Sequence, residues 1–230
     1  MSLRDDIQES LKNALPIMLG YVAIGIPCGI LSASVGLNAL QVFLFCLLFY
    51  SGAGQFMIPN MWIAGAPIAS IVASVSLVNT RQMLYSASFA PFAQKASKVL
   101  SFFFAATVTD ESFGVNLSNF LDGAKDWTLR KSLLVNLCSQ SSWTVSCVVG
   151  VFVGNALGIP LAIASFAMTS IFICLLVTQK ITPANVVAAV CAALGVIACK
   201  AAGLTGPAIL VGALVGVACA IVFSRVRGHA

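Results

Sequence analysis

The first apolar run of the chain reads ALPIMLGYVAIGIPCGILSASV, from Ala14 to Val35. These 22 residues include no charged side chain, and a helix of about 20 apolar residues spans the hydrocarbon core of a bilayer. The run is far longer than a barrel strand of roughly 10 residues, and it lacks strict alternation of polar and apolar positions. It therefore predicts a transmembrane helix.

The composition of the whole chain agrees with a membrane protein. Of its 230 residues, 60% are hydrophobic and 8% are charged, whereas a soluble domain carries roughly 25% charged residues. The mean hydropathy of +1.01 leaves too little polar surface to cover a water-soluble globule. The net charge of +5 resides mainly at the ends of apolar runs, which favours orientation in a lipid bilayer over binding of nucleic acid. We expect an all-α polytopic membrane protein.

Seven further apolar runs follow the first. The eight predicted spans are Ala14–Val35, Ala39–Ile58, Ala64–Phe89, Val99–Leu121, Leu133–Gly154, Leu161–Val177, Ala184–Ala201 and Pro207–Phe223. A seven-span map is the alternative, because the last three runs have only 17 or 18 residues. We expect residues 1–230 to form a single transmembrane transporter domain, in which residues 1–13 are a cytoplasmic or interfacial segment, such as a short helix on the membrane surface.

Lysine and arginine residues predict the orientation of the chain, because they concentrate on the cytoplasmic side of membrane proteins. With the N-terminus inside, eight of them fall inside and three outside. Those inside are Arg4, Lys12, Lys125, Arg130, Lys131, Lys180, Arg225 and Arg227, and those outside are Lys95, Lys98 and Lys200. Both termini are therefore predicted to be cytoplasmic.

Glycine and proline predict breaks inside two of the spans. Gly52 and Gly54 each cost a helix about 1 kcal/mol relative to alanine, and Pro27 removes a backbone hydrogen bond. A break would free backbone N–H and C=O groups for a ligand, as in the discontinuous helices of transporters, while a kink without a ligand is the alternative. A weak similarity between residues 20–71 and 142–193 also suggests an internal repeat.

Glycines spaced four residues apart lie on one helix face and let two helix backbones approach closely. Three such groups are present: Gly25 with Gly29, Gly150 with Gly154 and Gly158, and Gly212 with Gly216. We expect them to form packing contacts inside the chain, and a docking face for a second subunit is the alternative.

Three charged residues lie in the interior of the apolar runs, away from their ends: Arg81, Asp110 and Glu111. A charge at the bilayer centre costs roughly 2.5–3.5 kcal/mol on insertion scales, so such residues mark solute or ion paths. A buried ion pair that only holds two helices together is the alternative. Because adjacent residues of a helix project about 100° apart, we expect Glu111 to pair with Arg81 and stabilise the structure. Asp110 would then face the solute path.

Polar and small residues in the same runs complete the candidate substrate and proton path. They are Gly52, Gly54, Gln55, Asn79, Gln82, Tyr85, Ser142 and Trp143. For Ser142 and Trp143, polar contact between helices is an equal alternative. The sequence predicts no catalytic residue, metal ligand or cofactor, since His229 is the only histidine, the cysteines form no C-x-x-C pair and no P-loop occurs. An intramembrane enzyme is thus disfavoured.

Four stretches resemble the AzlC family, the large subunit of branched-chain amino acid exporters. YSGAGQF at residues 50–56 is similar to the family's Y-[AS]-G-A-x-Q-F, and NTRQMLY at residues 79–85 to its [DN]-x-R-H-x-L-Y. TDESF at residues 109–113 is similar to T-D-E-x-F, and SSW at residues 141–143 to S-x-W. Gln82 stands where the family usually has histidine, so this position lacks a titratable group.

The resemblance implies a permease of the bacterial inner membrane that exports leucine, isoleucine and valine, with methionine as a further candidate, and that works with a small AzlD-type membrane subunit. From the residues themselves we expect a secondary transporter driven by the proton gradient. Arg81 or backbone N–H groups near Gly52 would bind a substrate carboxylate, while Asp110 or Glu111 would bind its ammonium or carry the proton. A structural or assembly subunit and a passive channel are the alternatives.

Overall fold

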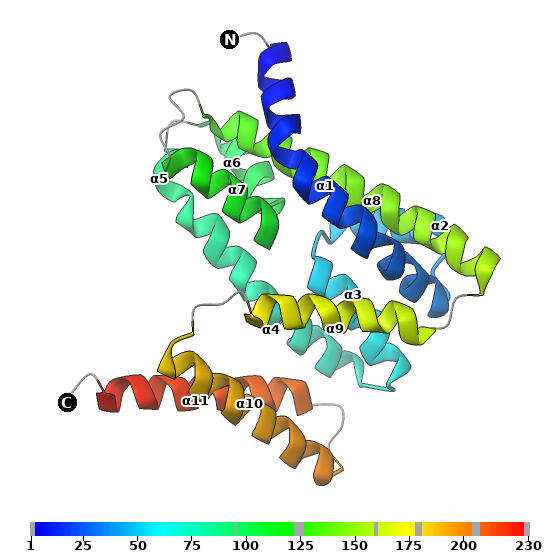
Figure 1. Cartoon of the computed structure of the whole chain (residues 1–230), viewed down its shortest axis with the longest axis vertical. Helices are drawn as coiled ribbons and strands as arrows, with labels where there is room; N and C mark the ends of the chain where they lie inside the picture. The colour runs from blue at the N-terminus through cyan, green and yellow to red at the C-terminus, as the bar shows by residue number, and fades with distance from the viewer. Residues whose placement is uncertain are drawn as a thin grey trace. The chain divides into compact units, whose positions relative to one another are not determined.

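In the computed structural model, all regular secondary structure of the described residues is α-helical; these residues are 3–94, 96–121, 127–158, 161–177, 181–203 and 208–227 (Figure 1). The helices are α1 (Leu3–Ser34), α2 (Ala39–Leu48), α3 (Gly52–Ile63), α4 (Ile68–Ser88), α5 (Ala90–Ala93), α6 (Lys98–Ala106), α7 (Asp110–Leu121), α8 (Leu129–Leu157), α9 (Leu161–Val177), α10 (Pro183–Ala201) and α11 (Ala208–Arg227). The predicted all-α fold is confirmed.

Each of the eight apolar runs coincides with one helix or with two consecutive short helices. The second run contains α2 and α3, and the fourth contains α6 and α7. Within the described residues, three helices are long and apolar enough to cross a membrane on their own: Arg4–Ser34, Leu129–Leu157 and Pro183–Ala201. The choice between eight and seven crossings stays a prediction.

The chain divides into two compact units, which are described separately. Unit 1 comprises residues 1–59 and 79–168, and unit 2 comprises residues 60–78 and 169–230. In unit 2, α10 packs against α11 across the glycines of α11. A Cβ atom at Gly212 would lie 2.8 Å from the carbonyl oxygen of Ala192, and one at Gly216 would lie 2.6 Å from that of Ala188. These glycines therefore pack within the chain, as predicted.

The centre of unit 1 is the contact between α1 and α8, which run side by side (Figure 1). A Cβ atom at Gly25 would lie 2.7 Å from Ser146 Cβ, and one at Gly150 would lie 3.0 Å from Gly29 Cα. Gly25, Gly29, Gly150 and Gly154 thus lie on internal packing surfaces. The predicted packing contact of Gly158 is wrong, because Gly158 ends α8 in a left-handed conformation and nothing lies within 4 Å of a Cβ atom there. The predicted break at Pro27 is wrong, because Gly25 and Gly29 hold α1 against α8 on either side of it and the helix continues to Ser34.

The close approach at Gly29 makes a strong prediction for stability. A Cβ atom there would overlap the Cys147 carbonyl group. At Gly20, on the opposite face of α1, nothing lies within 4 Å of a Cβ atom. We expect Gly29→Ala to lower the free energy of unfolding by about 2 kcal/mol through overpacking. Gly20→Ala, the matched control, should be neutral or stabilising, because alanine favours helix by up to about 1 kcal/mol over glycine. Denaturant unfolding in detergent measures both, and equal midpoints would contradict the packing.

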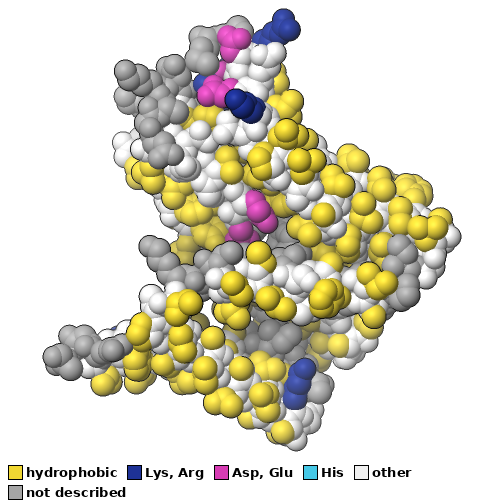
Figure 2. Space-filling model, viewed as in Figure 1, with side chains coloured by type: hydrophobic (Ala, Val, Ile, Leu, Met, Phe, Trp, Pro, Cys, Tyr) yellow, Lys and Arg dark blue, Asp and Glu magenta, His cyan; other side chains and the backbone are white. Residues whose placement is uncertain are grey.

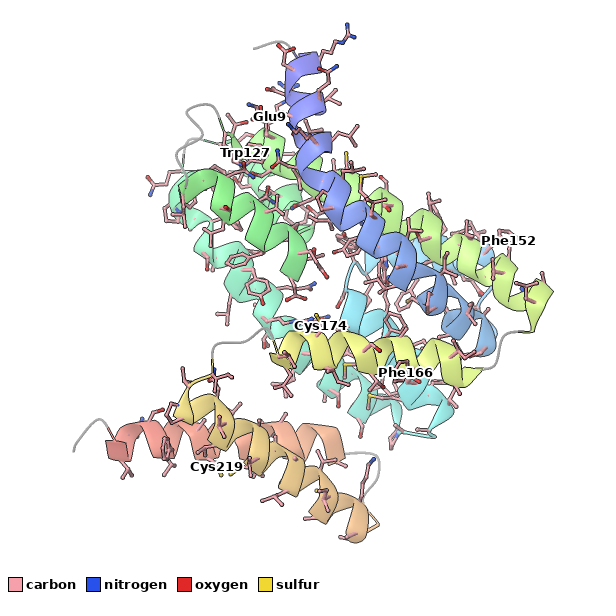
Figure 3. All side chains as sticks on the ribbon, in the orientation of Figure 1. Glu9, Trp127, Phe152, Phe166, Cys174 and Cys219 are labelled. Carbon is pink, nitrogen blue, oxygen red and sulfur yellow. The ribbon has the colours of Figure 1, made fainter. Side chains whose placement is uncertain are left out.

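The N-terminal ends of α1 and α8 are joined by a buried lysine. The Lys131 side chain is 2% exposed, and its Nζ lies 2.6 Å from Glu9 Oε2 and 3.8 Å from Asp6 Oδ1. The Ser10 hydroxyl also donates to the Lys131 carbonyl at 3.1 Å. Glu9 and Trp127, which directly precedes this end of α8 along the chain, are both labelled in Figure 3. The first three turns of α1 are therefore continuous with the first span and pack on α8, so a separate surface helix is not formed.

This contact also constrains the path of the chain. Since α1 and α8 begin at the same side, an even number of crossings must separate their starts. That condition is met if α1, the α2–α3 pair, α4 and the α6–α7 pair each cross once. The predicted side of the membrane for the termini rests on the distribution of lysine and arginine.

Candidate functional site

The first interruption in unit 1 separates α2 from α3 at Phe49, Tyr50 and Ser51. The sequence placed this break at Gly52 and Gly54, which instead form the first turn of α3. The Ser51 hydroxyl accepts a hydrogen bond from the Gly54 N–H at 3.2 Å, which caps that turn. A Cβ atom at Gly54 would lie 2.9 Å from both the Phe49 ring and Ser51 Oγ. A side chain at position 54 would therefore have to displace Phe49 or Ser51, the residues that form the break.

The second interruption divides the predicted continuous span Val99–Leu121, and that prediction of one helix is wrong. Helix α6 ends at Ala106, where the Thr107 hydroxyl donates to the Phe103 carbonyl at 2.8 Å. Helix α7 begins at Asp110, where the Thr109 N–H donates to Ser112 Oγ at 2.9 Å. Hydroxyl side chains compete for backbone hydrogen bonds in this way without any glycine or proline. The break places both carboxylates in the first turn of α7, where the helix dipole favours them.

Helix α8 satisfies the backbone of both breaks with two amide side chains one turn apart. Gln140 Nε2 donates to the carbonyls of Cys46 and Leu47 at the end of α2, at 3.3 Å each. Asn136 Nδ2 donates to Thr107 Oγ1 at the end of α6 at 3.2 Å and to the Phe104 carbonyl at 3.5 Å, a carbonyl that also accepts from the Thr107 N–H at 3.1 Å. The last carbonyls of a helix have no intrahelical partner, and leaving them unpaired in a membrane costs several kcal/mol. We call these two residues the amide clamps. Sequence reasoning missed them.

Gln55 and Trp143 meet at the first break. Gln55 is completely buried; its Nε2 donates to the Phe49 carbonyl at 2.8 Å, and its Oε1 accepts a hydrogen bond from Trp143 Nε1. On the neighbouring face of α8, the Ser142 hydroxyl donates to the Met18 carbonyl of α1 at 2.9 Å. In this structure Gln55, Ser142 and Trp143 thus make polar contacts between elements, which was the stated alternative for Ser142 and Trp143.

An ion pair joins α4 to the start of α7. Arg81 Nη2 lies 2.9 Å from Asp110 Oδ2, and the two side chains are 26% and 19% exposed. The expected pairing of Arg81 with Glu111 is therefore wrong, because the break restarts the helix at Asp110 and directs that carboxylate towards α4. Arg81 Nε and Asp110 Oδ1 are both buried, and neither has a hydrogen-bond partner among the described residues.

Glu111 has a different environment from its neighbour. It is exposed, it forms no ion pair within the described part of the chain, and its Oε2 accepts a hydrogen bond from the Tyr21 hydroxyl at 2.7 Å. Tyr21 Oη lies 2.8 Å from Thr109 Oγ1, and its ring packs edge-on against Trp143 at a centroid distance of 5.2 Å. Tyr21 was not among the predicted site residues, although a lone tyrosine in an apolar run requires a partner for its hydroxyl.

The remaining candidates on α4 connect the two breaks. Asn79 Oδ1 accepts from the Ser51 hydroxyl at 2.7 Å, and Gln82 Nε2 donates to the Tyr50 carbonyl at 3.5 Å. Tyr85 stacks on Phe113 of α7, with ring centroids 4.4 Å apart. All the predicted site residues lie in unit 1. On the face drawn in Figure 2, acidic side chains gather at two places in a largely hydrophobic surface.

Comparison with known proteins places these features in a family. The family described as "AzlC protein" matches residues 16–157, which include every candidate site residue. The inner membrane protein YgaZ of Escherichia coli (strain K12) is 28% identical over 92% of this chain and 86% of its own length. An uncharacterized membrane protein of Helicobacter pylori (strain ATCC 700392 / 26695) is 30% identical over 81% of this chain and 85% of its own length.

A relative with a named transport activity lies further away in sequence. The branched-chain amino acid transport protein AzlC of Bacillus subtilis (strain 168) is 23% identical over 78% of this chain and 71% of its own length. No solved structure matches the chain. Because the family match covers more than half of the 230 residues and the relatives align over most of their length, this chain belongs to the AzlC family.

Proposed function

We propose that this protein is the large subunit of a two-subunit secondary transporter that exports branched-chain amino acids across the bacterial cytoplasmic membrane in a proton-coupled cycle. Its family and the B. subtilis relative support a role in membrane transport. The substrate, the direction, the proton and the AzlD-type partner are parts of the proposal. A transporter role also agrees with the non-enzymatic character expected from the sequence.

The observation that carries the proposal is the Arg81–Asp110 ion pair with its two unsatisfied atoms. Arg81 Nε–H can donate to a carboxylate, and Asp110 Oδ1 can accept from an ammonium group. A zwitterionic amino acid offers both groups. It would open the 2.9 Å contact and replace it with one ion pair to each residue, so that both protein charges keep a partner in the occupied and the empty states.

The neighbourhood of the ion pair supports an apolar substrate side chain. Tyr85 and Phe113 form a stacked aromatic pair. Tyr85 lies one helical turn after Arg81 on α4, and Phe113 lies one turn after Asp110 on α7. Phe113 and Tyr85 in turn pack against the buried cluster that contains Phe89 and Phe104. Burial of an aliphatic side chain against such a surface is favourable by about 1.5–3 kcal/mol, which suits leucine, isoleucine and valine.

Efflux of preloaded amino acids tests the proposal. Cells lacking their own branched-chain exporters should release labelled leucine, isoleucine or valine faster when they express this chain with a small AzlD-type subunit. We expect Asp110→Asn to reduce this flux by about tenfold or more at unchanged expression, because the ammonium group loses its counter-charge. Ser141→Ala, an exposed neighbour of the clamp on α8, is the matched control and should export normally.

The alternatives give different results in the same assay. A passive channel would never release amino acid against its own gradient. A structural or assembly subunit would show lower partner expression in Asp110→Asn with no change in flux per assembled complex. Wild-type cells that release amino acid no faster than cells without the chain would refute the proposed transport.

A further inference from the structure

We infer that Glu111 is the group that binds the coupled proton and that Tyr21 transmits its charge state to α1 and to the α6–α7 break. This assignment rests on the proposed function and deepens it, because it separates the proton site from the substrate site. The two adjacent carboxylates would then have distinct roles: Asp110 is neutralised by Arg81 or by substrate, and Glu111 by a proton.

The surroundings of the two carboxylates support this division. Asp110 has a guanidinium at 2.9 Å, and its side chain is 19% exposed. Glu111 has no cationic partner in the described ranges, and its side chain is exposed at the surface of the chain. Because a lone negative charge is costly in a membrane protein, a proton is the counter-charge that Glu111 can acquire without a movement of other side chains.

The side chains of Glu111, Tyr21 and Thr109 form a hydrogen-bonded chain, through which protonation of Glu111 can change the structure. Tyr21 has one hydroxyl proton and donates it to Glu111 Oε2 at 2.7 Å, so the Thr109 hydroxyl is the donor in the 2.8 Å contact with Tyr21 Oη. When a proton from water binds a Glu111 oxygen, the carboxylic acid can donate to Tyr21. The Tyr21 hydroxyl then turns to donate to Thr109, and the direction of the chain is reversed.

Thr109 connects this reversal to the backbone at the start of α7. Its Oγ1 accepts from the Ser112 N–H at 3.5 Å and so contributes to the cap of α7, the helix that carries both carboxylates. When the Tyr21 hydroxyl donates to Thr109 Oγ1, the Thr109 hydroxyl no longer donates to Tyr21 and can donate to Ser112 Oγ, which lies 3.3 Å away. Protonation of Glu111 therefore changes the hydrogen bonds of the first turn of α7, next to the Arg81–Asp110 pair that opens for substrate.

Within the described residues, the other ionisable groups near Glu111 come from three helices and from the α2–α3 break. They are Tyr21 of α1, Tyr50 of the α2–α3 break, Arg81 and Tyr85 of α4, and Asp110 of α7. Arg81 is bound to Asp110, and the tyrosines titrate near pH 10 in water, far above the physiological range. Glu111 is thus the carboxylate in this group that is left to respond to the proton gradient.

Two transport modes measured in membrane vesicles separate the proton site from the substrate site. Vesicles containing the full chain and its small subunit are assayed for transport of labelled leucine driven by a pH gradient and for exchange of leucine without any gradient. We expect Glu111→Gln to lower the ratio of driven transport to exchange by about tenfold or more, because glutamine keeps the contact with Tyr21 but cannot ionise. Proton movement recorded by a pH-sensitive dye during leucine flux should disappear in this variant.

Companion variants keep the inference testable if Glu111→Gln is poorly inserted. Glu111→Asp retains the proton site, so driven transport should persist with a shifted pH profile between about pH 5 and about pH 8, and Tyr21→Phe should shift the profile in the same assay without abolishing exchange. Asp110→Asn should depress both modes together. If wild type moves no leucine, the proposed function itself fails. If wild type moves leucine and Glu111→Gln retains full proton coupling, or Tyr21→Phe and Glu111→Asp keep the wild-type pH profile, the assignment of the proton to Glu111 is refuted.

Discussion

Arg81→Gln is expected to lower the free energy of unfolding by about 3 kcal/mol, because it leaves the Asp110 carboxylate without its cation in an apolar surrounding. The two side chains are mostly shielded, at 26% and 19% exposure, and they connect α4 to the first turn of α7. Loss of the guanidinium also removes the carboxylate-binding half of the proposed substrate site. We therefore expect export by this variant to be lost together with stability.

A double-mutant cycle separates the ion pair from simple loss of polar surface. Arg81→Gln with Asp110→Asn removes both charges of the ion pair, so no carboxylate is left without its cation. We expect this double variant to recover most of the stability that the single Arg81→Gln loses, while export remains absent. Unfolding by denaturant in detergent gives the four free energies. If the loss of stability in the double variant equals the sum of the two single losses, Arg81 and Asp110 are not energetically coupled, and the ion pair does not stabilise the fold.

Removal of the amide clamps should have the second large effect. Gln140→Leu leaves the carbonyls of Cys46 and Leu47 without the side-chain donor at the end of α2, and we expect a loss of about 2–3 kcal/mol. Asn136→Leu should cost a comparable amount, because it removes the donor to Thr107 Oγ1 and the acceptor of the buried Asn116 amide, while the Phe104 carbonyl keeps the Thr107 N–H as its donor. Both leucines have a suitable size for a buried helix position, so the loss would report the missing hydrogen bonds.

The same helix provides a control for the clamp. Ser141 is exposed, and its hydroxyl donates only within its own helix, to the Leu137 carbonyl, so Ser141→Ala should change the free energy of unfolding by less than about 0.5 kcal/mol. Hydrogen exchange should also increase selectively at the ends of α2 and α6 in the clamp variants. If Gln140→Leu were as stable as Ser141→Ala, the carbonyls of α2 would not depend on α8.

The sequence predicted the positions of the helical segments well because hydropathy is a local signal. The predicted run Ala184–Ala201 corresponds to α10, which starts one residue earlier at Pro183, where the Thr182 hydroxyl accepts from the Asn185 N–H at 3.2 Å. The position of the second break was missed, because a search for glycine and proline does not detect threonine caps. Thr109 followed by Asp110 and Glu111 is a helix start signal, since acidic residues favour the first turn.

The contacts among the candidate site residues could be predicted only partly from the sequence. Arg81 and the two carboxylates were found because charges are rare in apolar runs. Their pairing depended on a continuous helix through Asp110, and that premise failed at the break. The link between Tyr21 and Glu111 joins residues 90 positions apart, and no local pattern of spacing contains such a contact. Long-range packing therefore determined which carboxylate meets Arg81.

The glycine contact between α1 and α8 also has a consequence for the biogenesis of the protein. Gly29 and Gly150, which nearly touch, are separated by 121 positions in the chain. At a translation rate of about 5–20 residues per second, roughly 6–24 s pass between synthesis of the two glycines. During that time α1 must enter the membrane and hold its place without the helix that later covers it. Its insertion thus depends on its own hydrophobicity, and a polar substitution in α1 would act at the translocon, before any contact with α8 exists to compensate for it.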